Sequence, residues 1–554
     1  MDTSAKKGFD IWRLLTLIIL GVFLLFIIYP LLLVLKKSVI DPQTGAFTLD
    51  YFKKFFQRKF YWITIVNSFK VTIVSTFIAV AIGLPIAYVM RRIKIKGSGI
   101  LEILIIISYL SPPFIGAYAW IQLLGRSGVI TKFLNTTFNL KFDGIYGFKG
   151  IVLVFALQSF PLVYMYISGA LKNLDNSLNE AAESLGYTNI QRIFKIIIPL
   201  VMPTVLASAL LVFMRVIADF GTPMLIGEGY KTMPVLIYGQ YMSEVGGDDG
   251  FAAALCVIMI VVTIMLFLVQ RLISSRYTYS MTALKPMAQE KAKGTKNILA
   301  HIFVYICVFF AILPQAVVIY TSFKKNRGGQ VFVKGFSLDS YRATLLAKDN
   351  SIITNTYKLG IIAIFIIVIF GILISYLTAR KKNRLTSILD TITMFPFIIP
   401  GSVLGISYLF AFSIPPILLS GTTLIMITSF AIRRMPYTIR SSTAIIGQIS
   451  PSIEEAAISL GESEVGAFTK VVIPMMMPGV IAGAIMSWIT VISELSSSII
   501  LYTTETQTLT VSIYTEVIRG NYGNAAAYST ILTLTSVISL FLFFKLTGKR
   551  ELSV

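Results

Sequence analysis

The sequence predicts an all-α integral membrane protein with about 12 transmembrane helices, arranged as two parallel six-helix repeats. Three observations support this class: an apolar composition, a series of long apolar runs, and an internal repeat that relates the two halves of the chain. Of the 554 residues, 56% are hydrophobic and only 13% are charged, and the mean hydropathy is +0.80. A soluble domain of this size would need more polar residues to cover its surface, so we expect the chain to lie in a lipid bilayer.

The transmembrane helices are predicted from apolar runs of about 20 residues, because a helix satisfies its own backbone hydrogen bonds in lipid. Twelve such runs are present, at residues 12–35, 63–90, 100–124, 149–171, 196–219, 251–271, 298–322, 352–378, 387–411, 424–445, 471–493 and 525–546. Each is expected to cross the membrane as a helix.

The two halves of the chain repeat one another. The segment NSFKVTIVSTFIAVAIGLPIAYVMRR, which begins at Asn67, aligns without a gap with NTYKLGIIAIFIIVIFGILISYLTAR, which begins at Asn355. An even number of helices separates equivalent points, so the repeats are expected to be parallel in the membrane. We predict a first repeat at residues 1–285, a cytoplasmic linker at 286–297 and a second repeat at 298–554.

The orientation is predicted from short basic loops. Residues 91–96 (RRIKIK) and 380–384 (RKKNR) each carry four basic residues and no acidic one, which places them in the cytoplasm together with the linker and both termini. The outer loops are also basic, but they are longer and weigh less in orientation. The formal net charge of +22 is dispersed among such loops, and contact with anionic lipid explains it better than nucleic acid does.

A polar segment interrupts each half between two apolar runs. LNEAAESLGYTNIQRIFKIIIPLVMP at residues 178–203 is matched by IEEAAISLGESEVGAFTKVVIPMMMP at residues 453–478, at an offset of 275. Asp175 and Ser450 stand where an N-cap belongs, and Gly186 and Gly461 can take the left-handed conformation that ends a helix. We therefore predict short cytoplasmic helices at about 175–186 and 450–461, too short to span the membrane.

These short helices suit contact with another protein. Their apolar residues follow one stripe, at Leu174, Leu178, Ala181, Ala182 and Leu185 and at the five equivalent positions of the second copy. The small alanines leave room for a partner surface, and Glu180 and Glu455 offer a charge to an arginine. The alternative is an amphipathic helix among lipid headgroups, which would call for bulky apolar and basic residues instead.

Both copies resemble the EAA loop of ABC transporter permeases: Glu-Ala-Ala, a glycine six residues after the glutamate, and a later Ile-Pro step. The resemblance implies a type I importer permease fold in which these segments are coupling helices seated in a groove of a cytoplasmic ATPase. The docking residues implied are Glu180, Ala181, Ala182, Gly186, Glu455, Ala456, Ala457 and Gly461. It also implies two copies of that ATPase, an extracytoplasmic binding protein, and the bacterial inner membrane as the location.

The chain carries no GxxxxGK[ST] phosphate loop, so ATP and Mg²⁺ are expected on the ATPase subunits and no cofactor on this chain. No constellation of nucleophile, base and orienting group is visible, so the chain is not expected to be an enzyme or to hold catalytic residues. His301 is the lone histidine, and Cys256 and Cys307 both lie in apolar runs, so no metal site or disulfide is expected.

Ionisable residues in the membrane are candidates for the translocation pathway. Arg433 and Arg434 align with Gln158 and Ser159 of the first half, and they either face the bundle interior or mark the cytoplasmic end of their helix. Asp219 and its repeat equivalent Glu494 could cap or balance the arginines, line the entry for a cation, or lie at the membrane interface.

The segments ADFGTP and RRMPYTIR resemble fused permeases of ferric iron importers, which implies iron as the transported solute. Related permeases carry phosphonates and other organic phosphates, thiamine or polyamines, and the buried arginines would suit an anion equally well. An ion-coupled secondary transporter also commonly has 12 helices in pseudo-symmetric halves. It would have no use for two capped cytoplasmic helices of this composition.

Overall fold

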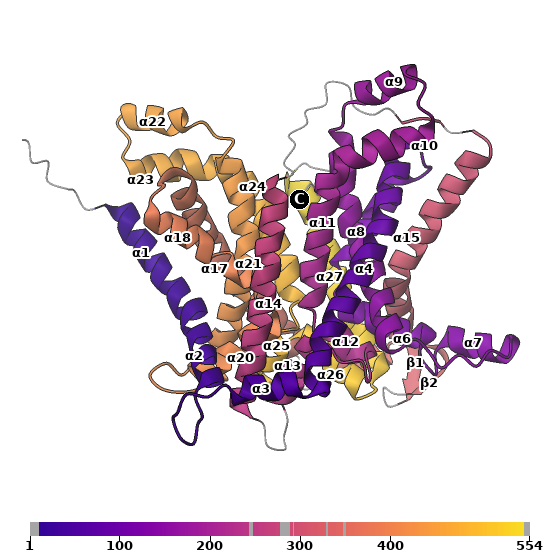
Figure 1. Ribbon diagram of the computed structural model, residues 1–554, viewed down its shortest axis with the longest axis horizontal. Helices are drawn as coiled ribbons and strands as arrows, with labels where there is room; N and C mark the ends of the chain where they lie inside the picture. The colour runs from indigo at the N-terminus through magenta and orange to yellow at the C-terminus, as the bar shows by residue number, and fades with distance from the viewer. Residues whose placement is uncertain are drawn as a thin grey trace, which may run out of the picture.

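The computed structural model describes residues 10–242, 248–276, 289–291, 293–327, 331–346 and 351–547. In this part of the chain the structure is helical apart from one short hairpin, as Figure 1 shows. The predicted linker at 286–297 is described only in part, because residues 286–288 and 292 lie outside these ranges.

The first half contains these elements: α1 (Ile11–Phe23), the π-helical turn η1 (Leu24–Ile28), α2 (Tyr29–Val39), α3 (Asp50–Gln57), α4 (Lys59–Arg92), α5 (Ser98–Leu110), α6 (Pro113–Leu124), α7 (Val129–Thr137), α8 (Gly147–Lys172), α9 (Asn176–Ser184), α10 (Asn189–Arg192), the π-helical turn η2 (Ile193–Ile197), α11 (Ile198–Ile217), α12 (Gly221–Ile226), α13 (Met233–Tyr241) and α14 (Asp249–Arg276).

The second half repeats this order: α15 (Thr295–Ser322), β1 (Lys324–Arg327), β2 (Val331–Phe336), α16 (Asp339–Leu345), α17 (Ser351–Arg380), α18 (Arg384–Ile392), α19 (Phe395–Ile398), α20 (Gly401–Phe412), α21 (Thr423–Ile446), α22 (Pro451–Ser459), α23 (Glu464–Ala467), the π-helical turn η3 (Phe468–Val472), α24 (Ile473–Ile492), α25 (Ser498–Leu501), the 3₁₀ turn η4 (Thr504–Thr506), α26 (Leu509–Ile518) and α27 (Tyr522–Thr547). Strands β1 and β2 pair antiparallel, with Lys324 opposite Phe336 and Arg327 opposite Val331.

The predicted spans are confirmed as helices, and two of them are broken. Nine spans among the described residues are long and apolar enough to cross a membrane, and two bent pairs raise the number to 11. The predicted span at 424–445 is α21, whose three arginines make it less apolar than the others. The runs at 100–124 and 387–411 are not single helices, because they bend by 100° and 110°. A proline follows each break, at Pro112 and Pro400, and proline cannot donate the backbone hydrogen bond that would continue the helix.

The first helix of each half packs against the other half. Helices α1 and α2 contact α17, α18 and α20 of the second repeat, and α15 contacts α4, α5 and α6 of the first. Trp12 of α1 is an example, because its ring centre lies 4.8 Å from that of Tyr376 and 5.3 Å from that of Phe468, both in the second half. The two sequence repeats are therefore interlocked rather than separate packing units.

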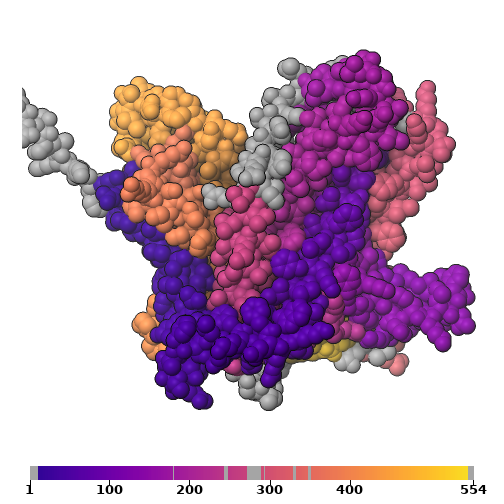
Figure 2. Space-filling view, in the orientation of Figure 1, coloured from indigo at the N-terminus to yellow at the C-terminus, as the bar shows by residue number. Residues whose placement is uncertain are grey.

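The two short helices predicted to be cytoplasmic, α9 and α22, lie at the same end of the molecule. In Figure 1, α9 and α22 lie at the top, whereas α3, α7 and the β1–β2 hairpin lie at the opposite end. Figure 2 shows the lobes that carry α9 and α22 standing apart with a hollow between them, whereas the opposite end is continuous. At that end the two halves are in direct contact. For example, the Tyr118 hydroxyl of the first half donates a hydrogen bond to the carbonyl oxygen of Tyr522 of the second half at 2.5 Å.

Candidate functional site

Helices α9 and α22 begin at the predicted caps. The Asp175 carboxylate accepts a hydrogen bond from the backbone N–H of Ser177 at 2.9 Å, and the Ser450 hydroxyl accepts one from Ser452 at 3.4 Å. Pro451 occupies the first position of α22, where its missing N–H is no loss. Both N-termini are thus fixed by side chains that the sequence places before the helix.

Both helices also end at the predicted glycines. Gly186 has φ +82° and Gly461 has φ +100°, a region that residues with a Cβ rarely adopt. Past each glycine the next backbone N–H reaches back into the last turn, from Tyr187 to Ala182 at 3.0 Å and from Glu462 to Ala457 at 3.1 Å. This is the Schellman arrangement, which satisfies the last carbonyls and sends the chain sharply back toward the membrane.

The predicted apolar stripe is not one continuous face, and this corrects the sequence analysis. Ala182 is buried against the chain's own residues, whereas Leu185 is 78% exposed and its counterpart Leu460 is 88% exposed. The helices therefore turn an alanine inward and hold a leucine outward at the glycine end. Exposed leucines of this kind are the apolar anchors that a partner groove can bury.

The other predicted docking residues lie mostly on the outside. Glu180, Ala181 and Gly186 are exposed on α9, and Glu455, Ala456 and Gly461 are exposed on α22, whereas Ala457 is half-buried. The Glu180 carboxylate accepts a hydrogen bond from the Asn176 amide at 2.8 Å. A partner can reach all of these except Ala182 directly.

Helix α22 is fastened to the membrane helix α17 by a buried acid that the sequence analysis did not single out. Glu454 is buried, accepts a hydrogen bond from the Tyr376 hydroxyl, and lies 3.7 Å from Nε of Arg380. Arg380 in turn donates to the carbonyl oxygen of Ile449 at 2.6 Å. The signal for this role is the first of the two glutamates of IEEAA, where the first copy has Asn179.

The first half uses different contacts at the equivalent place. Arg92 is the repeat counterpart of Arg380, and it forms an ion pair with Glu290 of the linker rather than with a residue of α9. The buried Arg192 of α10 instead pairs with Glu183 of α9 at 2.5 Å. Helices α9 and α22 are thus equivalent in shape but are held by different contacts.

A second candidate site lies in the middle of the membrane helices. Glu494, at the end of α24, pairs one carboxylate oxygen with Arg433 and the other with Arg434, both on α21. The Glu494 side chain is only 1% exposed, and those of Arg433 and Arg434 are 11% and 20% exposed. The arginines lie near the midpoint of α21, so they do not mark the end of their helix.

The two repeat-equivalent acids share a further role. The Glu494 carboxylate accepts a hydrogen bond from the backbone N–H of Ser497 at 3.1 Å, and Asp219 accepts one from Thr222 at 2.9 Å. Each carboxylate thus accepts a backbone hydrogen bond three residues ahead, at the start of a short helix, α25 or α12. Glu494 also forms ion pairs with two arginines, whereas Gln158 and Ser159 occupy the equivalent positions of the first half and Asp219 interacts at longer range with Arg215.

Arg215 is a third arginine in this region, which the sequence analysis did not name. It lies on α11 with its guanidinium 4.6 Å from the ring centre of Tyr109, and Tyr109 also interacts electrostatically with Arg434 of the other half. Its signal is a single arginine inside the apolar run VFMRVI. Three arginines and two carboxylates leave this region with a net charge of +1.

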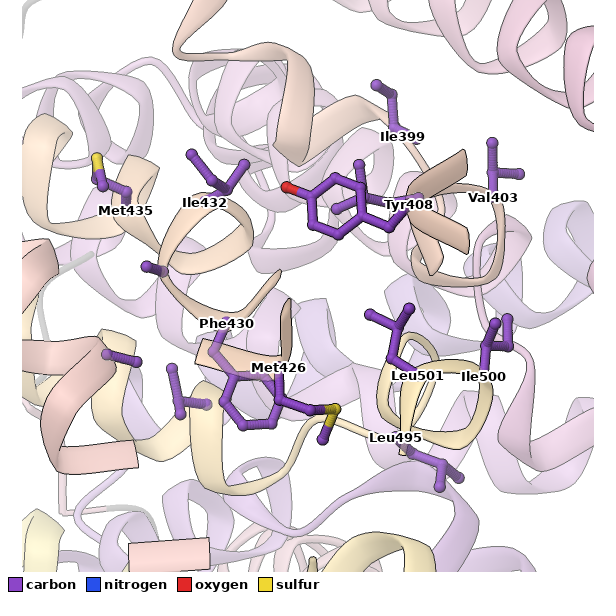
Figure 3. Close-up of a cluster of buried hydrophobic side chains, with 14 of the residues drawn as sticks. Ile399, Val403, Tyr408, Met426, Phe430, Ile432, Met435, Leu495, Ile500 and Leu501 are labelled. Carbon is purple, nitrogen blue, oxygen red and sulfur yellow. The ribbon is translucent and has the colours of Figure 1, made fainter. Parts of the chain in front are cut away.

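The surroundings of the ion cluster are close-packed. A Cβ added at Gly401 would collide with the guanidinium of Arg433, so only glycine fits there. Figure 3 shows the adjoining apolar wall, with Tyr408 of α20 pointing toward Ile432 of α21 and Leu501 of α25 below them. Among the described residues no three His, Cys, Asp or Glu side chains gather closely enough to hold a metal ion.

Comparison with known proteins matches both halves of the chain. Residues 79–279 and 367–550 match the model of the family described as binding-protein-dependent transport system inner membrane component. The ferric transport system permease protein FbpB of Actinobacillus pleuropneumoniae is 30% identical over 97% of this chain and 78% of its own length. A putative ferric transport system permease protein FbpB 1 of Haemophilus influenzae is 28% identical over 90% and 79%.

A shorter relative matches less of the chain. The molybdenum transport system permease protein ModB of Escherichia coli K12 is 29% identical over 38% of this chain and 91% of its own length. One such permease thus corresponds to about half of this chain, in line with the internal repeat. The chain belongs to the family of binding-protein-dependent transport system inner membrane components, the multi-pass permease subunits of ABC transporters.

Proposed function

We propose that this chain forms the translocation pathway of an importer for ferric iron. Iron is proposed because of how much of the chain is matched: two relatives named for ferric transport align along 97% and 90% of it. The relative named for molybdenum transport aligns along only 38%. The fused form of the pathway, with both halves in one polypeptide, is thus shared with the ferric permeases.

Two copies of a cytoplasmic ATPase would dock on α9 and α22, with ATP and Mg²⁺ bound by the ATPases. The end of the molecule that carries α9 and α22 would then be cytoplasmic, together with both termini and the linker, and the opposite end would receive the extracytoplasmic binding protein. The exposed Leu185 and Leu460, beside Glu180 and Glu455, support this assignment. An apolar anchor beside an exposed acid fits a groove with a basic rim.

The helices that follow the docking segments connect them to the buried acids. Residues Glu464–Ile492 form one continuous span that begins after α22 and ends just before Glu494. Residues Asn189–Ile217 likewise run from α9 to just before Asp219. When ATP binding draws α9 and α22 together, both spans would tilt, and the acids at their far ends would move with the short helices that follow them.

The charge of the pathway favours iron accompanied by an anion. A net positive region repels a bare trivalent cation, and in a medium of low dielectric constant this repulsion is strong. The cluster of Arg433, Arg434 and Glu494 would attract a complex of ferric iron with small carboxylate or oxyanion ligands. A net positive region would also attract phosphonate and other organic phosphates, so these remain alternative substrates. It would repel thiamine and polyamine cations, which therefore fit the site poorly.

The test is uptake of radioactive ferric iron by cells that lack the chain and by the same cells supplied with it. We expect uptake to be lost on deletion and restored by the wild-type chain, while labelled molybdate uptake stays unchanged. Unchanged iron uptake, with loss of phosphonate uptake instead, would overturn the assignment of iron. Iron uptake that persists without ATP but collapses with the proton gradient would favour a secondary transporter.

A separate test addresses docking. Reversing both exposed acids, Glu180→Lys with Glu455→Lys, should abolish transport while leaving the chain inserted in the membrane. Co-purification of the ATPase should fall in the same variant. Normal ATPase association and normal uptake in the double reversal would contradict the docking assignment.

A further inference from the structure

A cavity of about 340 Å³ lies beside the second docking helix, at the end of the bundle that carries α22. It is lined by residues of α1, the turn between α17 and α18, and α23: Asp10, Trp12, Arg13, Thr16, Arg380, Lys381, Lys382, Asn383 and Glu464. The volume lies at the lower end of the range of small-molecule sites. The cavity lies between α1 and the turn that joins α17 to α18.

The cavity is basic, and its acids are already engaged. Four of its side chains are basic and two are acidic, so its net charge is +2. Glu464 accepts hydrogen bonds from Lys381 at 2.7 Å and from the indole of Trp12 at 2.8 Å, and Asp10 caps α1 through backbone N–H groups. Within the described part of the chain, neither Arg13 nor Lys382 has an acidic partner. The positive charges of these two side chains are therefore available to an anionic ligand.

A buried donor also lacks a partner. Nε of Arg380 is buried and makes no hydrogen bond among the described residues, since its nearest carboxylate oxygen, on Glu454, is 3.7 Å away. A buried N–H without an acceptor costs about 1–3 kcal/mol. Arg380 therefore has unused hydrogen-bonding capacity in the wall of the cavity.

The other half of the protein shows what chemistry this position takes. There the counterpart of Arg380 is Arg92, and the linker brings the carboxylate of Glu290 to it. The linker is held in place by backbone bonds, from Glu290 N–H to the carbonyl of Arg92 at 2.8 Å and from Lys94 N–H to the carbonyl of Glu290 at 3.0 Å. The first half thus brings a linker carboxylate to Arg92, whereas the second half pairs Arg380 with Glu454 of α22 and has a cavity beside that arginine.

We propose that this cavity binds the phosphate group of an anionic phospholipid at the cytoplasmic membrane surface. The apolar residues beside it on α1 are exposed, with Leu14 at 40%, Leu17 at 47% and Ile18 at 53%, and they offer a surface for acyl chains. Because Arg380 also donates to the carbonyl oxygen of Ile449, just before α22, a bound phosphate would stiffen the attachment of that docking helix. The inference uses the proposed orientation, but its test measures lipid binding and not transport.

The experiment uses the purified full-length chain in a neutral detergent, titrated with short-chain phosphatidylglycerol, short-chain phosphatidylcholine and inorganic phosphate by calorimetry. The test variant is Arg13→Gln with Lys382→Gln. The matched control is Lys94→Gln with Arg384→Gln, which removes the same two kinds of charge outside the cavity, and Lys94 is the repeat counterpart of Lys382. Equal thermal unfolding temperatures of the two variants without lipid would show that both fold.

We expect the test variant to bind phosphatidylglycerol roughly thirty-fold more weakly than wild type, because each basic side chain near an anionic lipid contributes about fivefold. The control should stay within about twofold, and phosphatidylcholine should bind wild type weakly. Competition by millimolar inorganic phosphate would assign the site to phosphate from either source, and lack of competition would assign it to the lipid. Equal weakening in both variants, or equal affinity for the two lipids, would overturn the proposal.

Discussion

Replacing Glu494 by glutamine tests the buried ion cluster most directly. The carboxylate is 1% exposed and is shared by Arg433 and Arg434, so the substitution leaves two buried guanidinium groups without a counter-ion. Removing one partner of a buried ion pair costs about 3–5 kcal/mol. The hydrogen bond ahead of α25 survives, because the glutamine oxygen can still accept it from the Ser497 N–H. The loss of stability therefore measures the contribution of the ion pairs with Arg433 and Arg434.

The repeat supplies the control. Asp219→Asn makes the same kind of change at the equivalent acid, which forms no direct ion pair among the described residues and interacts with Arg215 only at longer range. The asparagine oxygen can still accept the hydrogen bond from the Thr222 N–H. We expect Glu494→Gln to lower the midpoint of unfolding in mixed detergent micelles by the equivalent of about 3–5 kcal/mol, and Asp219→Asn by less than about 1 kcal/mol. Changing Arg433 and Arg434 as well, to the glutamine and serine of the first half, should restore most of the loss. Equal midpoints for the two single variants would refute the reasoning.

Three further outcomes are expected. Leu460→Ala and Leu185→Ala should each weaken ATPase binding roughly fivefold to thirtyfold, as loss of an exposed apolar anchor does, and unchanged affinity in a binding assay with purified ATPase would contradict this. Glu454→Gln removes the ion pair between α22 and α17. The number of solutes carried per ATP hydrolysed should therefore fall in proteoliposomes, while ATPase binding persists. An unchanged ratio would show that this ion pair does not transmit the movement of α22 to the membrane helices. Gly401→Ala should cost about 1–3 kcal/mol in the unfolding assay by colliding with an arginine, whereas Gly169→Ala, which meets open space, should not.

The sequence predicts the membrane helices well, because bilayer thickness imposes length and composition on each span. It does not reveal that residues 100–124 and 387–411 are broken, since an apolar run looks alike whether straight or bent. Pro112 and Pro400 mark the positions, but Pro85 and Pro161 lie inside unbroken helices. Whether a proline breaks a helix depends on neighbours that can satisfy the freed backbone groups.

The docking helices could be predicted down to their caps, because capping is a local property of a few residues. Which face of the helix turns outward could not, since that depends on packing against distant elements. Ala182 and Leu185 belong to one apolar stripe in the sequence, yet one is buried and the other is exposed. Glu494 and Arg434 form an ion pair although they are 60 residues apart in the sequence. The repeat alignment identified the acid and the arginines as candidates but could not show that they are in contact.

The interlocking of the first helices has a consequence for how the protein is made. Helices α1 and α2 enter the membrane early, but their contacts on α17, α18 and α20 begin at Ser351, about 310 residues after Val39. At a synthesis rate of about 5–20 residues per second, those helices wait roughly 15–60 s for these contacts, while α2 can already pack against α14 of its own half. During that interval α1 is a lone helix whose buried face, with Trp12 and Phe23, is open to lipid and to any other nascent chain. Joining the halves in one polypeptide keeps the correct partner tethered nearby throughout the wait.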